Sequence, residues 1–175
     1  NGSYEAGLLF ASACLAGLGE VRLTHRCFRD PDSGTDPGFW LPAVEVSVDR
    51  PHIACLASQY AGWAVRTGGY FAIGSGPARA LGADEEIFSG LDYRDRADTA
   101  VLMLEGRSLP DEDVAAHVAL KCGVDPEHLF LLIAPTASLV GSIQIAARSA
   151  ETGMHKLAEL GFDVRRVASA FGLCP

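Results

Sequence analysis

Helix-like and strand-like segments alternate along this chain, and the alternation limits the possible folds more than any other feature. Segments with apolar residues at helical spacing are residues 5–18, 53–65, 111–122 and 137–160. Short apolar runs typical of strands occupy residues 44–48, 99–104 and 129–134. A Pro- and Gly-rich stretch at residues 30–38 predicts an exposed loop. We therefore predict an α+β (mixed α/β) fold with helices layered on a mixed sheet, and the absence of a fixed repeat excludes a solenoid.

Charge and hydropathy exclude two classes of partner. The formal net charge is −8 and Lys and Arg form no cluster, whereas proteins that bind nucleic acid present basic surfaces. No apolar run reaches the roughly 18 residues that a membrane-spanning helix requires. We expect neither nucleic acid nor a membrane as a partner.

The five cysteines are odd in number and widely spaced, which favours reduced thiols in the cytoplasm over a disulfide framework. His25, Cys27, His52 and Cys55 match no standard zinc spacing, so we expect no metal site. Cys55 lies in an apolar helical pattern, where a free thiol usually packs as a small hydrophobe.

Two strand-to-helix junctions offer backbone N–H groups at a helix start, where anions are favoured. Residues of these junctions that we consider for anion binding are Gly74, Ser75, Gly76, Arg79, Thr136 and Ser138. The first junction lacks the third glycine of a dinucleotide fingerprint and the Gly-Lys-Ser/Thr of a P-loop. A tight turn followed by a good helix start explains it equally well.

An arginine and a glutamate interrupt the small and apolar residues of the last helical segment. On a helix, Gln144, Arg148, Glu151 and His155 form one stripe beside the apolar face. Arg148 and Glu151 could form a common solvated surface pair. Alternatively, Glu151 could lie in a partly desolvated cleft as a proton acceptor, with Arg148 lowering its pKa. Sequence patterning leaves both interpretations open.

Several long stretches of the sequence resemble a known family, and this resemblance favours the catalytic interpretation of Arg148 and Glu151. The stretches YEAGLLFASACLAGL, HIACLASQYAGW, YFAIGSGPARAL and KCGVDPEHLFLLIAPTASLVGSIQIAARSAETGMHKLAELGFD closely resemble methenyltetrahydromethanopterin cyclohydrolases. The resemblance is weakest in residues 29–40 and at the end, ASAFGLCP. Chains of that family extend further at both ends, and this chain has no initiator Met, so we expect an internal fragment, with its domain boundary unknown.

The resemblance implies a fold with a large pocket between two domains, a cytoplasmic homo-oligomer, and no metal or redox cofactor. It implies reversible hydrolysis of N5,N10-methenyl-tetrahydromethanopterin to the N5-formyl compound, a reaction of one-carbon metabolism in methanogenesis or formaldehyde oxidation. It assigns catalysis to Glu151 and Arg148. Gln59 and Tyr60 are further candidates for contact with the pterin. The alternatives are a cyclohydrolase that acts on a folate-type carrier and a pterin-binding homologue without catalysis.

Overall fold

The computed structural model describes residues 2–175. Within these residues the α-helices are α1 (Tyr4–Cys14), α2 (Ala78–Gly82), α3 (Phe88–Leu91), α4 (Glu112–Cys122), α5 (Leu139–Ala146) and α6 (Ser149–Glu159). The strands are β1 (Gly19–Phe28), β2 (Phe39–Asp49), β3 (Trp63–Thr67), β4 (Tyr70–Ser75), β5 (Ala100–Glu105), β6 (Leu129–Ala134) and β7 (Ser169–Cys174). A π-helix, η1, spans His52–Gln59, and the short 3-10 helices are η2 (Pro126–His128) and η3 (Val164–Arg166).

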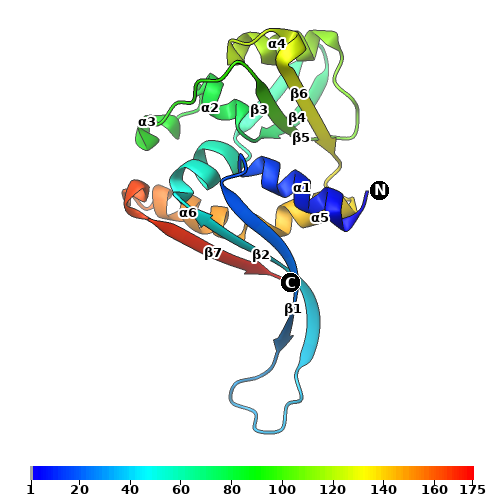
Figure 1. Cartoon of the computed structure of the whole chain (residues 1–175), viewed down its shortest axis with the longest axis vertical. Helices are drawn as coiled ribbons and strands as arrows, with labels where there is room; N and C mark the ends of the chain where they lie inside the picture. The colour runs from blue at the N-terminus through cyan, green and yellow to red at the C-terminus, as the bar shows by residue number, and fades with distance from the viewer. Residues whose placement is uncertain (1) are drawn as a thin grey trace.

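The strands form two separate sheets. The first has the order β1-β2-β7 and is antiparallel throughout. Its β1–β2 hairpin projects beyond the rest of the molecule (Figure 1). The second sheet has the order β3-β4-β5-β6, in which β5 and β6 are parallel and the other pairs antiparallel. The predicted α+β class and mixed sheet are confirmed, and the antiparallel sheet is an addition to them.

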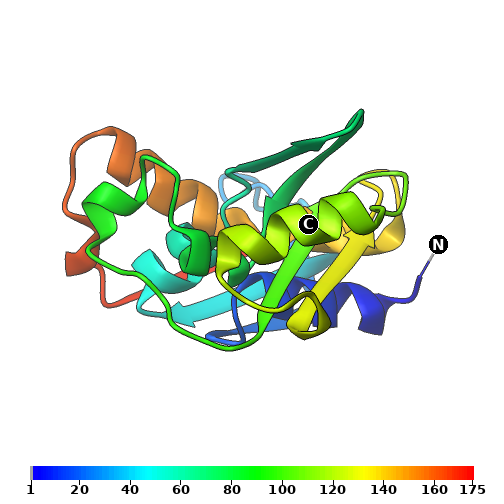
Figure 2. The same cartoon turned by 90° about the horizontal axis from the view of Figure 1, so that it is seen from above.

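A layer of helices separates the two sheets. Helices α1, α5, α6 and η1 lie between the sheets (Figure 1), and α4 lies across the outer face of the second sheet (Figure 2). One apolar core, which includes Val46, Leu56 and Met154, joins the first sheet to the helical layer. A second core, which includes Leu102 and Val118, joins the second sheet to α4. The boundary between helical layer and second sheet is where buried polar groups gather.

Most predicted elements are confirmed with small changes of boundary. The helix expected at residues 111–122 is α4, whose N-cap Asp111 accepts a hydrogen bond from the Val114 N–H at 2.9 Å. The strand expected at residues 129–134 is β6. The segments at 5–18, 44–48 and 99–104 correspond to α1, β2 and β5, and residues 30–38 form the exposed hairpin loop.

The helix predicted over residues 53–65 is wrong in type and in length. The observed element is the π-helix η1, and it closes with a hydrogen bond from the Tyr60 N–H to the Cys55 carbonyl at 2.7 Å, five residues back. Residues 63–65 belong to β3. Helical and extended segments share short apolar runs, so periodicity alone could not separate the two elements.

The single helix predicted over residues 137–160 is also wrong, because the chain breaks between α5 and α6. Arg148 has φ −87° and ψ 6°, near the bridge region, and its N–H bonds the Ile145 carbonyl three residues back at 3.0 Å. The break contains neither Gly nor Pro, the residues that usually mark one in sequence. Arg148 is the N-cap residue of α6, and Glu151 stands in its first turn.

Two helical glycines allow a matched stability test. A Cβ at Gly141 in α5 would collide with the backbone carbonyl oxygens of Pro135 and Thr136, whereas a Cβ at Gly153 in α6 would meet nothing within 4 Å. We expect Gly141→Ala to lower the free energy of unfolding by about 1–3 kcal/mol, because a backbone contact cannot rotate away. Gly153→Ala should raise it by about 0.5–1 kcal/mol. Urea unfolding of the full-length protein measures both, and equal shifts would contradict the close approach at Gly141.

Candidate active site

Arg148 ties three elements together at the boundary between the helical layer and the second sheet. Its Nη1 donates to the Gln59 carbonyl at 2.6 Å, its Nη2 to Ser75 Oγ at 3.3 Å, and its Nε to Gln144 Oε1 at 3.0 Å. The side chain is only 11% exposed. The break before α6 therefore turns a charged side chain inward, and three neutral acceptors fix the plane of its guanidinium group.

Glu151 lies beside this guanidinium group and is itself 93% buried by relative surface area, being 7% exposed. Its Oε2 is 3.8 Å from Arg148 Nη1. Within residues 2–175 no hydrogen bond reaches its carboxylate. Burial raises the pKa of the Glu151 carboxyl, and the positive charges of Arg148, His155 and Arg79 oppose that rise without cancelling it. The result is a carboxyl group with free acceptor positions and a pKa closer to neutrality than usual.

A second carboxylate, that of Glu105, completes the cluster, and sequence reasoning missed it. Glu105 ends β5, in register with Ala134 of β6. Its Oε1 accepts a hydrogen bond from Gln144 Nε2 at 2.6 Å and lies 3.9 Å from Arg148 Nη2. The available signal was a lone acidic residue that ends the apolar strand VLMLE just before Gly106.

Of the two residues proposed for pterin contact, Gln59 lies inside the cluster and Tyr60 borders it. Gln59 is fully buried, and its Nε2 donates to the Ala147 carbonyl at 3.1 Å. Its Oε1 is buried without a hydrogen-bond partner, which leaves one acceptor available beside Arg148. The Tyr60 ring stacks on the His155 ring with centroids 4.6 Å apart.

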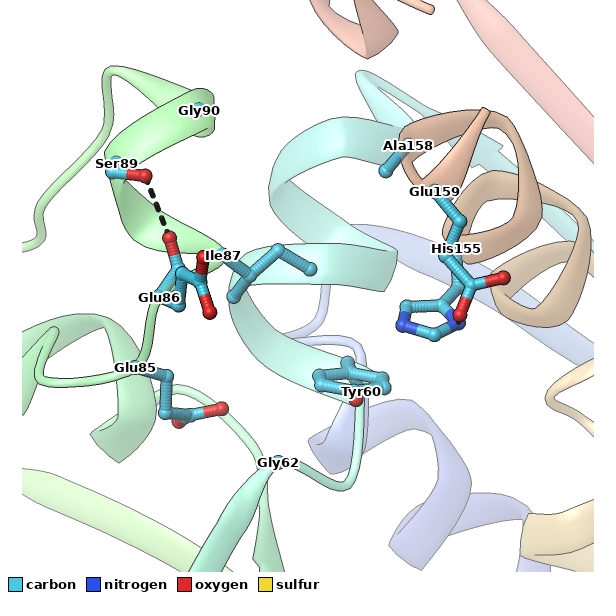
Figure 3. Close-up of a pocket in the computed structure, with 10 residues that line it drawn as sticks. All are labelled: Tyr60, Gly62, Glu85, Glu86, Ile87, Ser89, Gly90, His155, Ala158 and Glu159. Atoms are coloured by element: carbon cyan, nitrogen blue, oxygen red, sulfur yellow. Dashed lines mark hydrogen bonds and ion pairs between the residues drawn. The ribbon is translucent and has the colours of Figure 1, made fainter. Parts of the chain in front are cut away.

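A cavity of about 530 Å³ is lined in part by this ring pair (Figure 3). Tyr60 and His155 stand on one side of it, and the Glu85–Gly90 segment stands on the other (Figure 3). Arg148 and Glu151 are not among its lining residues. His155 is one turn beyond Glu151 on α6, and with Tyr60 it belongs to the lining of this cavity.

Comparison with known proteins identifies the family of this chain. The family model described as "Cyclohydrolase (MCH)" matches residues 1–175. Proteins named methenyltetrahydromethanopterin cyclohydrolase are 49% identical in Methanococcus maripaludis, over 99% of this chain, and 45% identical in Methanosarcina mazei and 43% in Methanococcoides burtonii, over all of it. The chain belongs to the cyclohydrolase family. It spans about half the length of these curated relatives, 52–53% of each.

Residues 74–79 of this cyclohydrolase-family chain form the predicted strand-to-helix junction, from β4 into α2. Ser75 reaches the cluster through Arg148 and also lies 3.5 Å from Cys14 Sγ. The Gly76 N–H is already bonded to the Ser58 carbonyl at 2.7 Å. Arg79 is 1% exposed, and its guanidinium group is held by the Glu85 carboxylate at 2.8 and 2.5 Å. The Gly76 N–H and the Arg79 guanidinium group are therefore used within the protein.

The second junction lies apart from the cluster. Ser138 is the N-cap of α5, accepting from the Gly141 N–H at 3.0 Å and donating to the Pro135 carbonyl at 2.6 Å. The eight residues of α5 separate it from Arg148 by about 12 Å of helix. Thr136 is exposed. The structure brings Ser75 and Gln59 to the Arg148–Glu151 pair and leaves Thr136 and Ser138 at the other end of the helix.

The thiols of the cyclohydrolase-family chain are all free. Burial raises the pKa of Cys55 to about 12, with the nearby Glu151 charge as the second cause, so this thiol is a poor nucleophile. In the part of the chain that the structure describes, no three His, Cys, Asp or Glu side chains are grouped as metal ligands. Among residues 2–175, no helix has both the length and the apolar character needed to cross a bilayer.

Proposed function

We propose that the protein to which this chain belongs hydrolyses N5,N10-methenyl-tetrahydromethanopterin to the N5-formyl compound, reversibly. The curated relatives carry the name of this activity, at 43–49% identity. The observation that carries the proposal is the Glu151 carboxylate, buried, without a hydrogen bond and 3.8 Å from Arg148. A structural ion pair would use its carboxylate oxygens fully, whereas a proton-transfer group needs one of them free.

The chemistry requires one group that first accepts a proton and then donates it. The substrate is an amidinium-like cation, and water adds to its central carbon. Glu151 takes a proton from that water as the C–O bond forms, which gives a neutral hydroxyl adduct. The C–N10 bond then breaks as Glu151 returns the proton to N10, and loss of the hydroxyl proton leaves the N5-formyl group. One proton is released in all.

Arg148 has an orienting and an electrostatic role in this proposal. Its Nη1 lies 3.8 Å from Glu151, and three protein acceptors fix its other contacts. Because its charge opposes the effect of burial on the pKa of Glu151, the carboxyl can begin the cycle ionised and still be a competent acid after it gains a proton.

The proposed substrate contacts fall into two groups, one for the pterin and one for the anionic tail of the carrier. Gln59, with its unpartnered Oε1, and Tyr60, with its stacked ring, are candidates for contact with the pterin. The anionic tail of the carrier needs positive groups or N–H donors, for which the candidates stay those of the two junctions: Gly74, Ser75, Gly76, Arg79, Thr136 and Ser138. Thr136 is the candidate with an exposed side chain, whereas Arg79 would first have to leave Glu85.

The remaining properties follow from the family resemblance. We propose a cytoplasmic homo-oligomer that needs no metal or redox cofactor, with the pterin as a one-carbon carrier and substrate. Free cysteines are in keeping with a reducing compartment.

The absorbance of the methenyl group tests the function directly. We expect full-length protein, dialysed against a chelator, to remove the methenyl chromophore of methenyl-tetrahydromethanopterin, at a rate proportional to enzyme concentration. The same assay with methenyl-tetrahydrofolate distinguishes the carriers, and a faster reaction with the folate would favour that alternative. Binding of the pterin without loss of the chromophore would identify a non-catalytic homologue.

A further inference from the structure

The guanidinium group of Arg148 is shared between two carboxylates. Its Nη1 faces Glu151 at 3.8 Å, and its Nη2 faces Glu105 at 3.9 Å. Neither distance is a hydrogen bond, so both carboxylates act on Arg148 mainly through charge. The three groups together carry one net negative charge when both carboxyls are ionised, a charge that complements a cationic substrate.

Gln144 connects Glu105 to Arg148 by hydrogen bonds. Its Nε2 donates to Glu105 Oε1 at 2.6 Å, and its Oε1 accepts from Arg148 Nε at 3.0 Å. A carboxylate can only accept hydrogen bonds, so Glu105 obliges the amide of Gln144 to present its NH₂ group to β5 and its oxygen to Arg148. Gln144 is 1% exposed, which leaves its amide little freedom to turn.

We propose that Glu105 is a positioning residue for the cyclohydrolase reaction, which through Gln144 and its own charge keeps Arg148 from pairing fully with Glu151. This inference rests on the proposed function. A guanidinium group that closed on Glu151 would make two short, charge-assisted hydrogen bonds. Those bonds would occupy the acceptor positions that the water needs and would weaken Glu151 as a base. Glu105, together with the hydrogen bonds of Arg148 to the Gln59 carbonyl and Ser75, holds the guanidinium group between the two carboxylates instead.

The other titratable groups around the cluster do not duplicate this role. Those that face Glu151 or Arg148 from α1, η1, α2 and α6 are Cys14, Cys55, Arg79 and His155. The two thiols are buried with a raised pKa and stay neutral, and Arg79 is paired with Glu85. Among the described residues, Glu105 is the one carboxylate apart from Glu151 within 4 Å of the Arg148 guanidinium group.

The test is the pH dependence of kcat for Glu105→Gln in the full-length enzyme. The amide keeps the size of Glu105 and can still accept from Gln144, but it removes the negative charge that draws Arg148 away from Glu151. We expect the acidic limb of the kcat profile to move to lower pH by about 0.5–1 unit. The kcat plateau should fall roughly 3- to 10-fold, because Glu151 becomes a weaker base. KM should change less than kcat.

Two variants control for charge and for position. Glu127→Gln removes the same charge from an exposed site, and its profile should coincide with that of the wild type. Glu105→Asp keeps the charge but draws it back by one methylene group, so its acidic limb should stay near the wild-type position while kcat falls. Glu105→Asp also tests the inference if Glu105→Gln does not fold, which a thermal melt would show.

The outcomes separate this inference from the proposed function. If Glu105→Gln lowered kcat equally at all pH values and left the acidic limb in place, the positioning role of Glu105 would be overturned. Cyclohydrolase activity of the wild-type enzyme would still uphold the proposed function. The positioning role would also be overturned if Glu105→Asp shifted the acidic limb of the kcat profile as far as Glu105→Gln does. A wild-type enzyme without cyclohydrolase activity would overturn both.

Discussion

Glu151→Gln should lower kcat by roughly 10²-fold or more, the usual contribution of a positioned general base, and should change KM much less. The amide keeps the size of the glutamate but cannot accept a proton from water. The methenyl chromophore assay with the full-length enzyme measures both constants. An unchanged kcat with a raised KM would make Glu151 a binding group for the cationic pterin. His155 would then be tested next as the base, and Gln144 as a group that positions the water.

Stability provides the control for this variant. Burial raises the pKa of Glu151, so the folded protein binds that proton more tightly than the unfolded chain does. The free energy of unfolding therefore falls as pH rises from the unfolded pKa, near 4.5, through the higher folded pKa. Gln carries no such penalty, and the Tm of Glu151→Gln at neutral pH should be no lower than that of the wild type. A large drop in Tm would attribute the lost activity to unfolding.

Arg148→Ala should have the second-largest effect, and its size should depend on pH. Without the guanidinium charge the pKa of Glu151 rises further, because desolvation is then less opposed. Glu151 becomes protonated at a higher pH than in the wild type, so the loss of kcat should be greater on the acidic side of the profile than on the alkaline side. We expect kcat to fall roughly 10- to 100-fold on the alkaline side, because Glu151 is no longer oriented. Below the wild-type pKa of Glu151, kcat should fall by up to about tenfold more.

Arg148→Ala also removes the one cation between two carboxylates, which should cost about 3 kcal/mol of unfolding free energy at pH 7. Kinetics should therefore be measured well below the Tm of the variant. Arg166→Ala removes an exposed arginine from the same half of the chain, and it should affect neither the pH profile nor, by more than about 0.5 kcal/mol, the stability. If Arg148→Ala lowered kcat by the same factor at all pH values, Arg148 would only orient Glu151 and would not tune its pKa.

Elements with strong local signals could be predicted from the sequence. Helix α4 has an N-cap Asp111, a periodic apolar face and Gly123 as its C-cap. Strand β6 is a continuous apolar run between Pro126 and Pro135. The strands β1 and β7 were missed, because β1 mixes charged and apolar residues on its exposed hairpin and β7 is short and rich in small residues.

Only part of the candidate site could be predicted. Arg148 and Glu151 stand out because they interrupt an apolar segment three residues apart, but it was the family resemblance that assigned catalysis to them. Glu105 was missed, because its partner Gln144 lies 39 residues away and no local pattern announces the contact. Gln59 was proposed for a ligand, yet its carbonyl serves Arg148, an arrangement that depends on how η1 ends against α6. Contacts made by tertiary packing leave no periodic signal.

The contacts of Arg148 with Gln59 and Ser75 join residues 89 and 73 positions apart in the chain. Loops of that length close late in folding, after the helices and hairpins whose contacts are local. The guanidinium group can find its final partners only once the helical layer has docked on the second sheet. Enzyme turnover during refolding is thus a reporter of the last docking step, and it should recover after the far-ultraviolet circular dichroism signal has returned.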